Sequence, residues 1–165
     1  SDTSCVSAEL EGLSYEGNIK IKSLNRGVIG GLIGFMGNYK LKNSYANASI
    51  VVTQDGLNSA GGLLGRSGNG AVDIENCHSN TNISASNVGS NIGGLIGHVL
   101  AIGSLQIRDS FYNSDSYTIN SDALGSYTHS GVSALTNAEM ADSNNFSNWD
   151  FANIWKIASG MPQHR

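Results

Sequence analysis

The sequence predicts an all-β protein: a short β-solenoid (parallel β-helix) of three to four coils of about 31–33 residues, closed by a C-terminal cap with a short helical turn. The first observation is a glycine-flanked apolar hexapeptide that occurs three times in the 165-residue chain. The second is a five-residue motif that recurs in phase with it. The third is composition, with 21 Gly, one Pro and only 13% charged residues. Internal periods of about 20–50 residues are typical of repeat architectures.

The hexapeptide reads IGGLIG at 29–34, AGGLLG at 60–65 and IGGLIG at 92–97. We interpret it as one strand of the repeating unit, with glycines that permit close backbone approach and turning at the strand ends. Its repetition favours this structural role over a phosphate-binding or cofactor-binding loop. The central leucines are expected to fill the core as an interior row: Leu32, Leu63 and Leu95.

Copies of the second motif lie 33 residues apart, as LKNSY at 41–45, IENCH at 74–78 and IRDSF at 107–111, after a degenerate LEGLS at 10–14. A short branched strand follows the first three copies, at 18–23, 49–53 and 82–86. One unit is therefore expected to hold three strands separated by turns. Each coil would pair in parallel with the next, at a strand separation of about 4.8 Å.

Stacking brings equivalent residues of successive coils into columns, so each motif position predicts an environment. The first column is aliphatic and is predicted to be interior: Leu10, Leu41, Ile74 and Ile107. The second alternates in charge and is predicted to face solvent: Glu11, Lys42, Glu75 and Arg108. Opposite charges attract and like charges repel between ladder neighbours, so the alternation supports this register.

The third column predicts a sharp corner, because Gly, Asn and Asp best tolerate left-handed backbone. It holds Gly12, Asn43, Asn76 and Asp109. The fourth column is small or apolar and is predicted to be interior: Leu13, Ser44, Cys77 and Ser110. Cys77 is therefore expected to be a buried, inert thiol. We predict no disulfide with Cys5, which is expected to lie two strand spacings or about 10 Å away. The Cα atoms of a disulfide lie within roughly 7 Å of each other.

The fifth column is predicted to face outward, because it follows an interior position; it holds Tyr45, His78 and Phe111. One interpretation is an aromatic stack that stiffens a face of the solenoid. Another is a shallow platform that binds sugar or peptide, which makes these three the candidate ligand-binding residues. A third is that a loop, 98–106 or 113–130, covers them.

The loops between the motifs are unequal in length and sequence. The longest excursion, 113–133, is polar and contains Asp115, Asp122 and His129. Loops on a rigid scaffold usually carry the specific function, so this segment is a second place where we would look for a ligand.

The tail is expected to cap the array, because an open sheet edge would otherwise pair with another molecule. Thr136 and Glu139 have capping-box spacing, which predicts a short helical turn, with Leu135 and Met140 as core anchors. A dense apolar run is expected to close the last coil: Phe146, Trp149, Phe151, Ile154, Trp155 and Ile157. The alternative is that its two tryptophans form a carbohydrate clamp.

The pattern GGL[IL]G, an insert and then I-x-[ND]-[SC]-aromatic resembles the GLUG repeat family. Residues 135–157, with F-x-x-W-D-F-x-x-[IV]-W, resemble the segment that often closes such arrays. GLUG repeats occur in tandem in bacterial surface proteins, including large adhesins and the non-catalytic part of some immunoglobulin A peptidases. The resemblance covers roughly residues 10–160 and implies a solenoid over 1–133 with a capping segment of the same domain over 134–165.

The residues do not favour catalysis, and no catalytic, cofactor-binding or metal-binding residue is assigned. The four His show no metal-ligand spacing, and the chain has no P-loop, nucleophile elbow or CxxC pair. Enzymes on β-helices use clustered carboxylates, whereas the 13 acids here are scattered or belong to the alternating column. We therefore predict that the protein is not an enzyme and needs no cofactor.

Composition also limits the partners. A formal net charge of −4 with nine scattered Lys and Arg disfavours nucleic acid. No apolar run approaches the roughly 20 residues of a membrane span, so membrane insertion is not expected. The amino terminus lacks a signal-peptide pattern, as expected for a fragment or mature segment.

Together with the resemblance, these features predict a non-catalytic extracellular module at a bacterial cell surface. It would bind a host or neighbouring-cell glycan or protein, contact other domains of the parent protein, or act as a spacer. The alternatives are the receptor-binding domain of a pilus subunit or phage fibre, and a polysaccharide-active β-helix enzyme.

Overall fold

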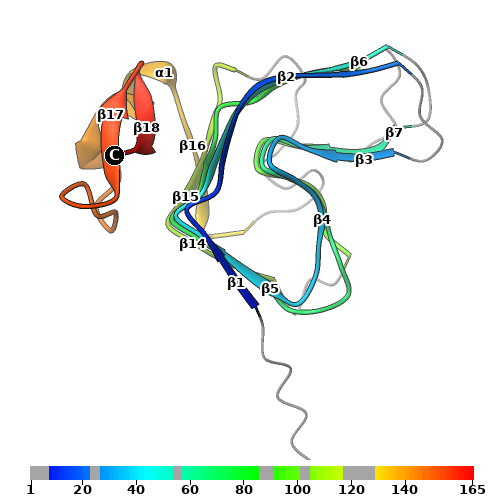
Figure 1. Cartoon of the computed structure of the whole chain (residues 1–165), viewed down its shortest axis with the longest axis horizontal. Coiled ribbons are helices and arrows are strands. Elements are labelled where there is room, and N and C mark those ends of the chain that lie inside the picture. The colour runs from blue at the N-terminus through cyan, green and yellow to red at the C-terminus, as the bar shows by residue number, and fades with distance from the viewer. Residues whose placement is uncertain (1–7, 23–26, 54–56, 86–90, 101–104, 117–128) are drawn as a thin grey trace, which may run out of the picture.

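The computed structural model describes residues 8–22, 27–53, 57–85, 91–100, 105–116 and 129–165. These residues form a mostly β structure with four parallel sheets and a two-stranded antiparallel C-terminal sheet (Figure 1). Viewed as in Figure 1, corresponding strands lie nearly on top of one another, because the chain follows the same path several times. The prediction of an all-β protein is confirmed.

Two sheets contain the second motif and the branched strands that follow it. Sheet A has the order β1 (Ala8–Glu11), β5 (Tyr39–Lys42), β9 (Val72–Glu75) and β14 (Leu105–Arg108). Sheet B is formed by β2 (Ser14–Ile21), β6 (Tyr45–Val52), β10 (His78–Ser79), β11 (Asn82–Ala85), β15 (Ser110–Asn113) and β16 (Val132–Leu135).

The other two parallel sheets contain the hexapeptides. Sheet C has the order β12 (Ile92–Gly93), β7 (Leu57–Gly61) and β3 (Gly27–Gly30). Sheet D has the order β13 (Ile96–His98), β8 (Leu64–Ser67) and β4 (Ile33–Met36). Each hexapeptide therefore begins in sheet C and ends in sheet D.

The interpretation of the hexapeptide as a single strand is wrong, because its middle is a corner between two strands. The unit from β3 to β6 consequently has four strands instead of the three expected. Glycine is needed at the corner: a Cβ at Gly30 would lie 1.9 Å from the carbonyl oxygen of Ile33. One at Gly62 would lie 2.1 Å from Ser79 Oγ on the sheet opposite.

The predicted columns of the second motif are confirmed by the strand register. Leu41 pairs with Leu10 on one side and Ile74 on the other, and Ile107 pairs with Ile74. The charged column keeps the same register, and Glu75 lies 3.9 Å from Lys42 and 3.3 Å from Arg108. Both contacts are partly exposed, as predicted for a solvent-facing row.

The third column forms the predicted corner, and every member has a positive φ. The values are 67° for Gly12, 46° for Asn43, 51° for Asn76 and 46° for Asp109. The side chains on the two sides of this corner therefore belong to sheets that meet at an angle, which Figure 1 shows where sheet A turns into sheet B.

The fourth column is buried at Ser44, Cys77 and Ser110, as predicted, but 36% of Leu13 is exposed. Leu13 belongs to the first motif copy, and no earlier copy covers it in the described part of the chain. Cys77 is a free, fully buried thiol. Cys5, for which we predicted no disulfide with Cys77, lies outside the described residues. Asp122 lies outside them as well.

Two apolar cores lie between the sheets. One contains the first column together with Leu63, Leu95, Leu64 and Ile96 from the hexapeptides, and Leu32 packs against its edge. The other lies between sheets B and C and is built on branched residues such as Ile50 and Ile83. Because each row of side chains continues through successive strands, burial is repeated along the stack.

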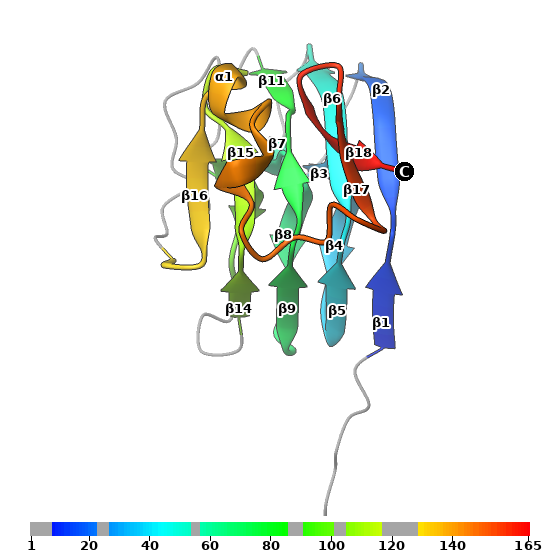
Figure 2. The same ribbon diagram turned by 90° about the vertical axis from the view of Figure 1, so that its left-hand side faces the viewer.

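The apolar run of the tail does not close the last unit, contrary to our expectation, because Phe146, Trp149 and Trp155 pack on the outward column of sheet B. Instead β16 pairs in parallel with β15 at that end. Residues 137–165, here called the C-terminal strap, contain α1 (Asn137–Met140), η2 (Ser143–Asn145) and the antiparallel pair β17 (Trp155–Ala158) and β18 (Met161–His164). Figure 2 shows the strap lying across the outer face of sheet B, over several strands at once.

Candidate functional site

The candidate platform formed by Tyr45, His78 and Phe111 is a real column, since His78 pairs in register with both neighbours. It points away from the interior, as predicted. It is nevertheless covered, with Tyr45 only 5% and His78 0% exposed. The hypothesis of an open ligand platform is therefore wrong for this structure. Among the described residues, the cover is the C-terminal strap. Parts of both loops that we considered, residues 101–104 and 117–128, lie outside the described residues.

Aromatic contacts join the column to the strap. Tyr45 stacks on His78 with ring centroids 5.1 Å apart, and Phe111 meets Phe146 edge-on at 5.0 Å. Trp149 and Trp155 lie in the same cluster, 4.4 Å apart. Because Trp149 is 7% and Trp155 0% exposed, they are not available as a carbohydrate clamp.

Polar contacts tie the strap to three successive motif copies. His164 Nε2 lies 2.8 Å from the carbonyl oxygen of Asn43, and His78 Nε2 lies 2.7 Å from that of Pro162. Trp149 Nε1 donates to the carbonyl oxygen of Asp109 at 2.8 Å. The capping box of Thr136 and Glu139 begins α1 as predicted, and Met140 at its end is fully buried.

Burial sets the electrostatics of this cluster. It lowers the pKa of His78 to about 4, a shift that the proximity of His164 reinforces. It also raises the pKa of Tyr45 to about 12, because the phenol is desolvated and donates to the Glu16 carboxylate at 2.6 Å. Both side chains are therefore neutral near pH 7, and the cluster stabilises the strap.

A second outward row of sheet B stays partly exposed at Asn47 and Asn80, although it is buried at Asn113, and forms the candidate site. It is a ladder of asparagine side chains at intervals of 33 residues. Asn80 Nδ2 donates to Asn47 Oδ1 at 3.0 Å, and Asn113 Nδ2 donates to Asn80 Oδ1 at 2.7 Å. Asn113 Nδ2 also donates to Asn137 Oδ1 on the strap at 2.7 Å. The ladder therefore fixes the orientation of each amide.

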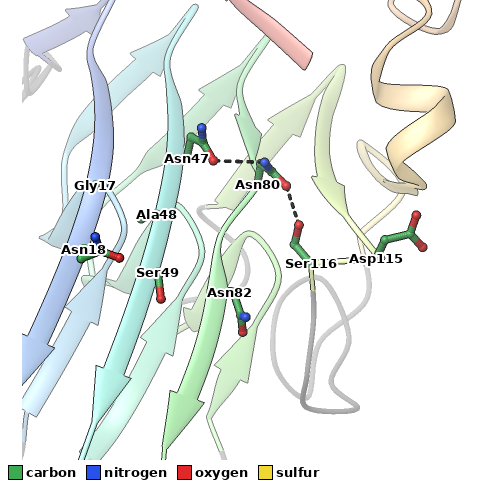
Figure 3. A pocket seen from close by; sticks show the side chains of 9 residues that line it. All are labelled: Gly17, Asn18, Asn47, Ala48, Ser49, Asn80, Asn82, Asp115 and Ser116. Carbon is green, nitrogen blue, oxygen red and sulfur yellow. Dashed lines mark hydrogen bonds between the residues drawn. The ribbon is translucent and has the colours of Figure 1, made fainter. Parts of the chain in front are cut away.

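Beside this ladder is a shallow groove with a volume of about 450 Å³. Figure 3 shows that the side chains around it come from three adjacent strands and from the segment that follows β15. Its lining consists of Gly17, Asn18, Asn47, Ala48, Ser49, Asn80, Asn82, Asp115 and Ser116. We call it the asparagine groove.

The register of the strands brings three polar side chains together on the floor of the groove. Asn18, Ser49 and Asn82 lie side by side on β2, β6 and β11, with about 4.8 Å between neighbouring strands. Ser116 Oγ donates to Asn80 Oδ1 from the wall. Among the described lining residues, Asp115 is the one charged group, and its Oδ2 accepts from the backbone nitrogen of Asn137 at 2.8 Å.

Two side chains of the groove, Asn47 and Ser49, still have polar groups that can form hydrogen bonds with a ligand. Asn80 uses both its amide oxygen and its amide nitrogen within the protein. In contrast, the amide nitrogen of Asn47 and the hydroxyl of Ser49 make no hydrogen bond to any described residue. Amides and hydroxyls held in this way can donate to and accept from a polar, uncharged ligand.

The rest of the described surface offers little reactive chemistry. Within the described ranges, no three His, Cys, Asp or Glu residues gather as a possible metal site. Cys77 has its pKa raised to about 12 by burial, so its thiol is protonated and enclosed. The acids of sheet A are paired instead, with Asp73 bound to Arg108 at 2.7 Å and Glu75 to Lys40 at 3.0 Å.

Our sequence interpretation missed the asparagine ladder, although a signal for it is present. Asn47, Asn80 and Asn113 follow the second motif at a constant interval, each two residues after the fifth column. Strand alternation places them on the same outward face as that column. Asp115, within the polar excursion that we singled out, does line the groove.

No family model, curated protein or solved structure matches the chain. In the described part of the chain, no helix has the length and apolar character needed to cross a membrane. The site is therefore interpreted from its own geometry.

Proposed function

We propose that the chain is a short β-solenoid that serves as a non-catalytic, extracellular recognition module of a bacterial surface protein. We further propose that its asparagine groove binds neutral carbohydrate. The observation that carries this proposal is the groove itself, whose described lining residues present amide and hydroxyl groups from three neighbouring strands and one carboxylate, that of Asp115.

The solenoid assignment is supported by strand pairing. Strands of equivalent position pair in parallel in four sheets, and the motif copies remain in register through all four members of sheet A. The resemblance of the two motifs to GLUG repeats points in the same direction and supports a bacterial surface location.

The chemistry of the groove favours a sugar over other ligands. Asn and Ser side chains match the hydroxyl groups of a glycan, each of which donates one hydrogen bond and accepts others. An anionic ligand would meet the Asp115 carboxylate and, among the lining residues, no cation. A largely apolar ligand would leave the amide of Asn47 without a partner, which is unfavourable once water is displaced.

The ladder adds preorganisation. An amide that is already held by its neighbours loses little rotamer entropy when a ligand binds, so more of each new hydrogen bond appears as affinity. Asn80 is held on three sides, by Asn47, Asn113 and Ser116. We infer that Asn80 positions the groove, whereas Asn47 and Ser49 contact the ligand.

A glycan array with the labelled 165-residue chain tests the proposal, followed by calorimetric titration of the strongest neutral hit. Asn47→Ala and Ser49→Ala should each weaken binding by about five- to tenfold, the loss expected for one hydrogen bond of about 1 kcal/mol. Ser84→Ala is the matched control, because Ser84 lies on the same face of sheet B, pairs with Val51 and does not line the groove.

The result that contradicts carbohydrate binding is an array without neutral hits, or hits that Asn47→Ala and Ser49→Ala leave unchanged. A spacer role would then be the better description of the module. Detectable turnover of a polysaccharide would instead contradict the non-catalytic part of the proposal.

A further inference from the structure

The outer face of sheet D carries an aromatic ring, a guanidinium and an imidazole in one row. Phe35 on β4 pairs with Arg66 on β8, and Arg66 pairs with His98 on β13. Met36 and Val99, which follow Phe35 and His98, lie in the core, so strand alternation directs the row outward. In Figure 1, β4 lies on the side of the stack away from the strap. The row belongs to a different sheet from the asparagine groove.

Arg66 is a partly buried cation without a counterion among the described residues. No described acid pairs with it, whereas Lys40, Lys42 and Arg108 all pair with acids. Its Nε is buried and has no hydrogen-bond partner in the described part of the chain, and the strands β4, β8 and β13 contain no acid. Because a partly desolvated charge is unfavourable without a partner, an anionic ligand would stabilise this side chain.

The neighbours of Arg66 narrow the chemistry of that ligand. Burial lowers the pKa of His98, and the positive charge of Arg66 lowers it further, so the imidazole is neutral near pH 7 and offers one donor and one acceptor. Phe35 is 60% exposed, and its Cζ would lie 3.1 Å from a Cβ at Gly68, the residue that follows β8. The ring therefore extends toward the strand that carries Arg66 and leaves an apolar face open beside the guanidinium.

A carboxylate matches the guanidinium, because two parallel N–H groups of arginine bind its two oxygens. The exposed aromatic face beside it fits a ligand that carries this carboxylate on an apolar surface. An acidic sugar combines both features, since its carboxylate is attached to a ring that has a face of C–H groups. We propose that the row binds the carboxylate of an acidic sugar through Arg66, while Phe35 packs against the sugar ring. This site is additional to the asparagine groove and does not depend on it.

Calorimetric titration of the 165-residue chain with galacturonate oligomers, glucuronate oligomers and a sialylated trisaccharide tests the proposal. At least one of these should bind. The methyl ester of that ligand should bind at least about tenfold more weakly, because esterification removes the charge that Arg66 pairs with. Arg66→Gln should cause a similar loss, and Phe35→Ala should weaken binding about threefold or more through lost apolar contact.

Lys156→Gln is the matched control, because Lys156 is an exposed cation on the strap and its loss changes the net charge equally. NMR spectra of the original chain locate the ligand independently of any variant. The imidazole signals of His98 should shift during the titration, whereas those of the buried His78 should stay in place. This measurement decides the site even if Arg66→Gln lowers the thermal midpoint.

The proposal would be overturned if none of the acidic sugars binds, if acid and ester bind equally, or if Lys156→Gln weakens binding as much as Arg66→Gln. A peptide with a free C-terminal carboxylate, or inorganic sulfate, that displaces the sugar at equal concentration would also overturn the assignment to a sugar. Asn47→Ala should leave the binding of acidic sugars unchanged, and Arg66→Gln should leave neutral hits unchanged, so failure at one site is distinguishable from failure at the other.

Discussion

His78 Nε2 and the carbonyl oxygen of Pro162 are 2.7 Å apart, although the two residues are 84 positions apart in the chain. A carbonyl can only accept, so Nε2 carries the proton and donates it. Nδ1 of the same ring is buried and has no hydrogen-bond partner among the described residues. His78 is therefore a neutral imidazole that holds the strap over the aromatic column.

This arrangement predicts that the protein loses stability in mild acid. The unfolded chain protonates His78 near pH 6.5, whereas the folded chain protonates it only near pH 4, because burial lowers its pKa to about 4. The contribution is fully present above pH 6.5. Between these values the free energy of unfolding should fall with decreasing pH, by up to about 1.4 kcal/mol per pH unit.

Urea unfolding at a series of pH values measures this effect. His78→Gln removes the titrating group, so its unfolding free energy should change less between pH 6.5 and 4 than that of the original chain. Identical pH dependence in the two proteins would assign the acid sensitivity to other groups.

The hexapeptide corner predicts different outcomes for two glycines of the same column. A Cβ at Gly65 would lie 2.6 Å from the carbonyl oxygens of Gly34 and Ile29, whereas one at Gly34 would meet only the carbonyl oxygen of Val28, at 3.4 Å. Gly65→Ala should therefore lower the free energy of unfolding by about 1–3 kcal/mol. Gly34→Ala should stay within about 0.5 kcal/mol of the original chain. Equal losses in urea unfolding would show that the close backbone contact at Gly65 does not set the cost of a side chain.

The left-handed corner of the second motif predicts a preference at Asn76. Its φ is 51°, and most residues with a Cβ are strained in this region by about 1–2 kcal/mol. Asn76→Ala should therefore destabilise the protein by about 1 kcal/mol, while Asn76→Gly should be nearly neutral because glycine adopts this conformation freely. Thermal or urea unfolding checks both. A more stable Asn76→Ala variant would contradict a backbone cause.

Burial predicts that Cys77 is inert in the folded protein. The thiol is 0% exposed and its pKa is raised to about 12, so both access and thiolate are lacking. In a Cys5→Ser background, a thiol reagent such as Ellman's reagent should react only as fast as the protein opens or unfolds. Complete labelling within seconds under native conditions would show that Cys77 is accessible.

Much of the stack could be predicted from the sequence, because its spacing is local and repeated. Once Leu41, Ile74 and Ile107 lie one above another, every other motif position must pair with its equivalent. The positive φ of Asn43, Asn76 and Asp109 agrees with the recurrence of Gly, Asn and Asp at one motif position, because these residue types best tolerate left-handed backbone. The same regularity did not reveal the corner inside each hexapeptide. An apolar run flanked by glycines is compatible with either one strand or two strands with a bend.

Only the tertiary structure decided where the strap lies and which surface remains open. Trp149, Trp155 and Phe146 are strongly apolar, and their sequence requires burial but does not specify the surface that provides it. The outward column of Tyr45 and Phe111 provides that surface, so the strap covers the residues that first suggested a ligand platform. Two positions further along each strand, Asn47 and Asn80 stay partly exposed, because their amides bond within the row and need no apolar cover. Asn113, the last of the row, is buried where it bonds to Asn137 of the strap.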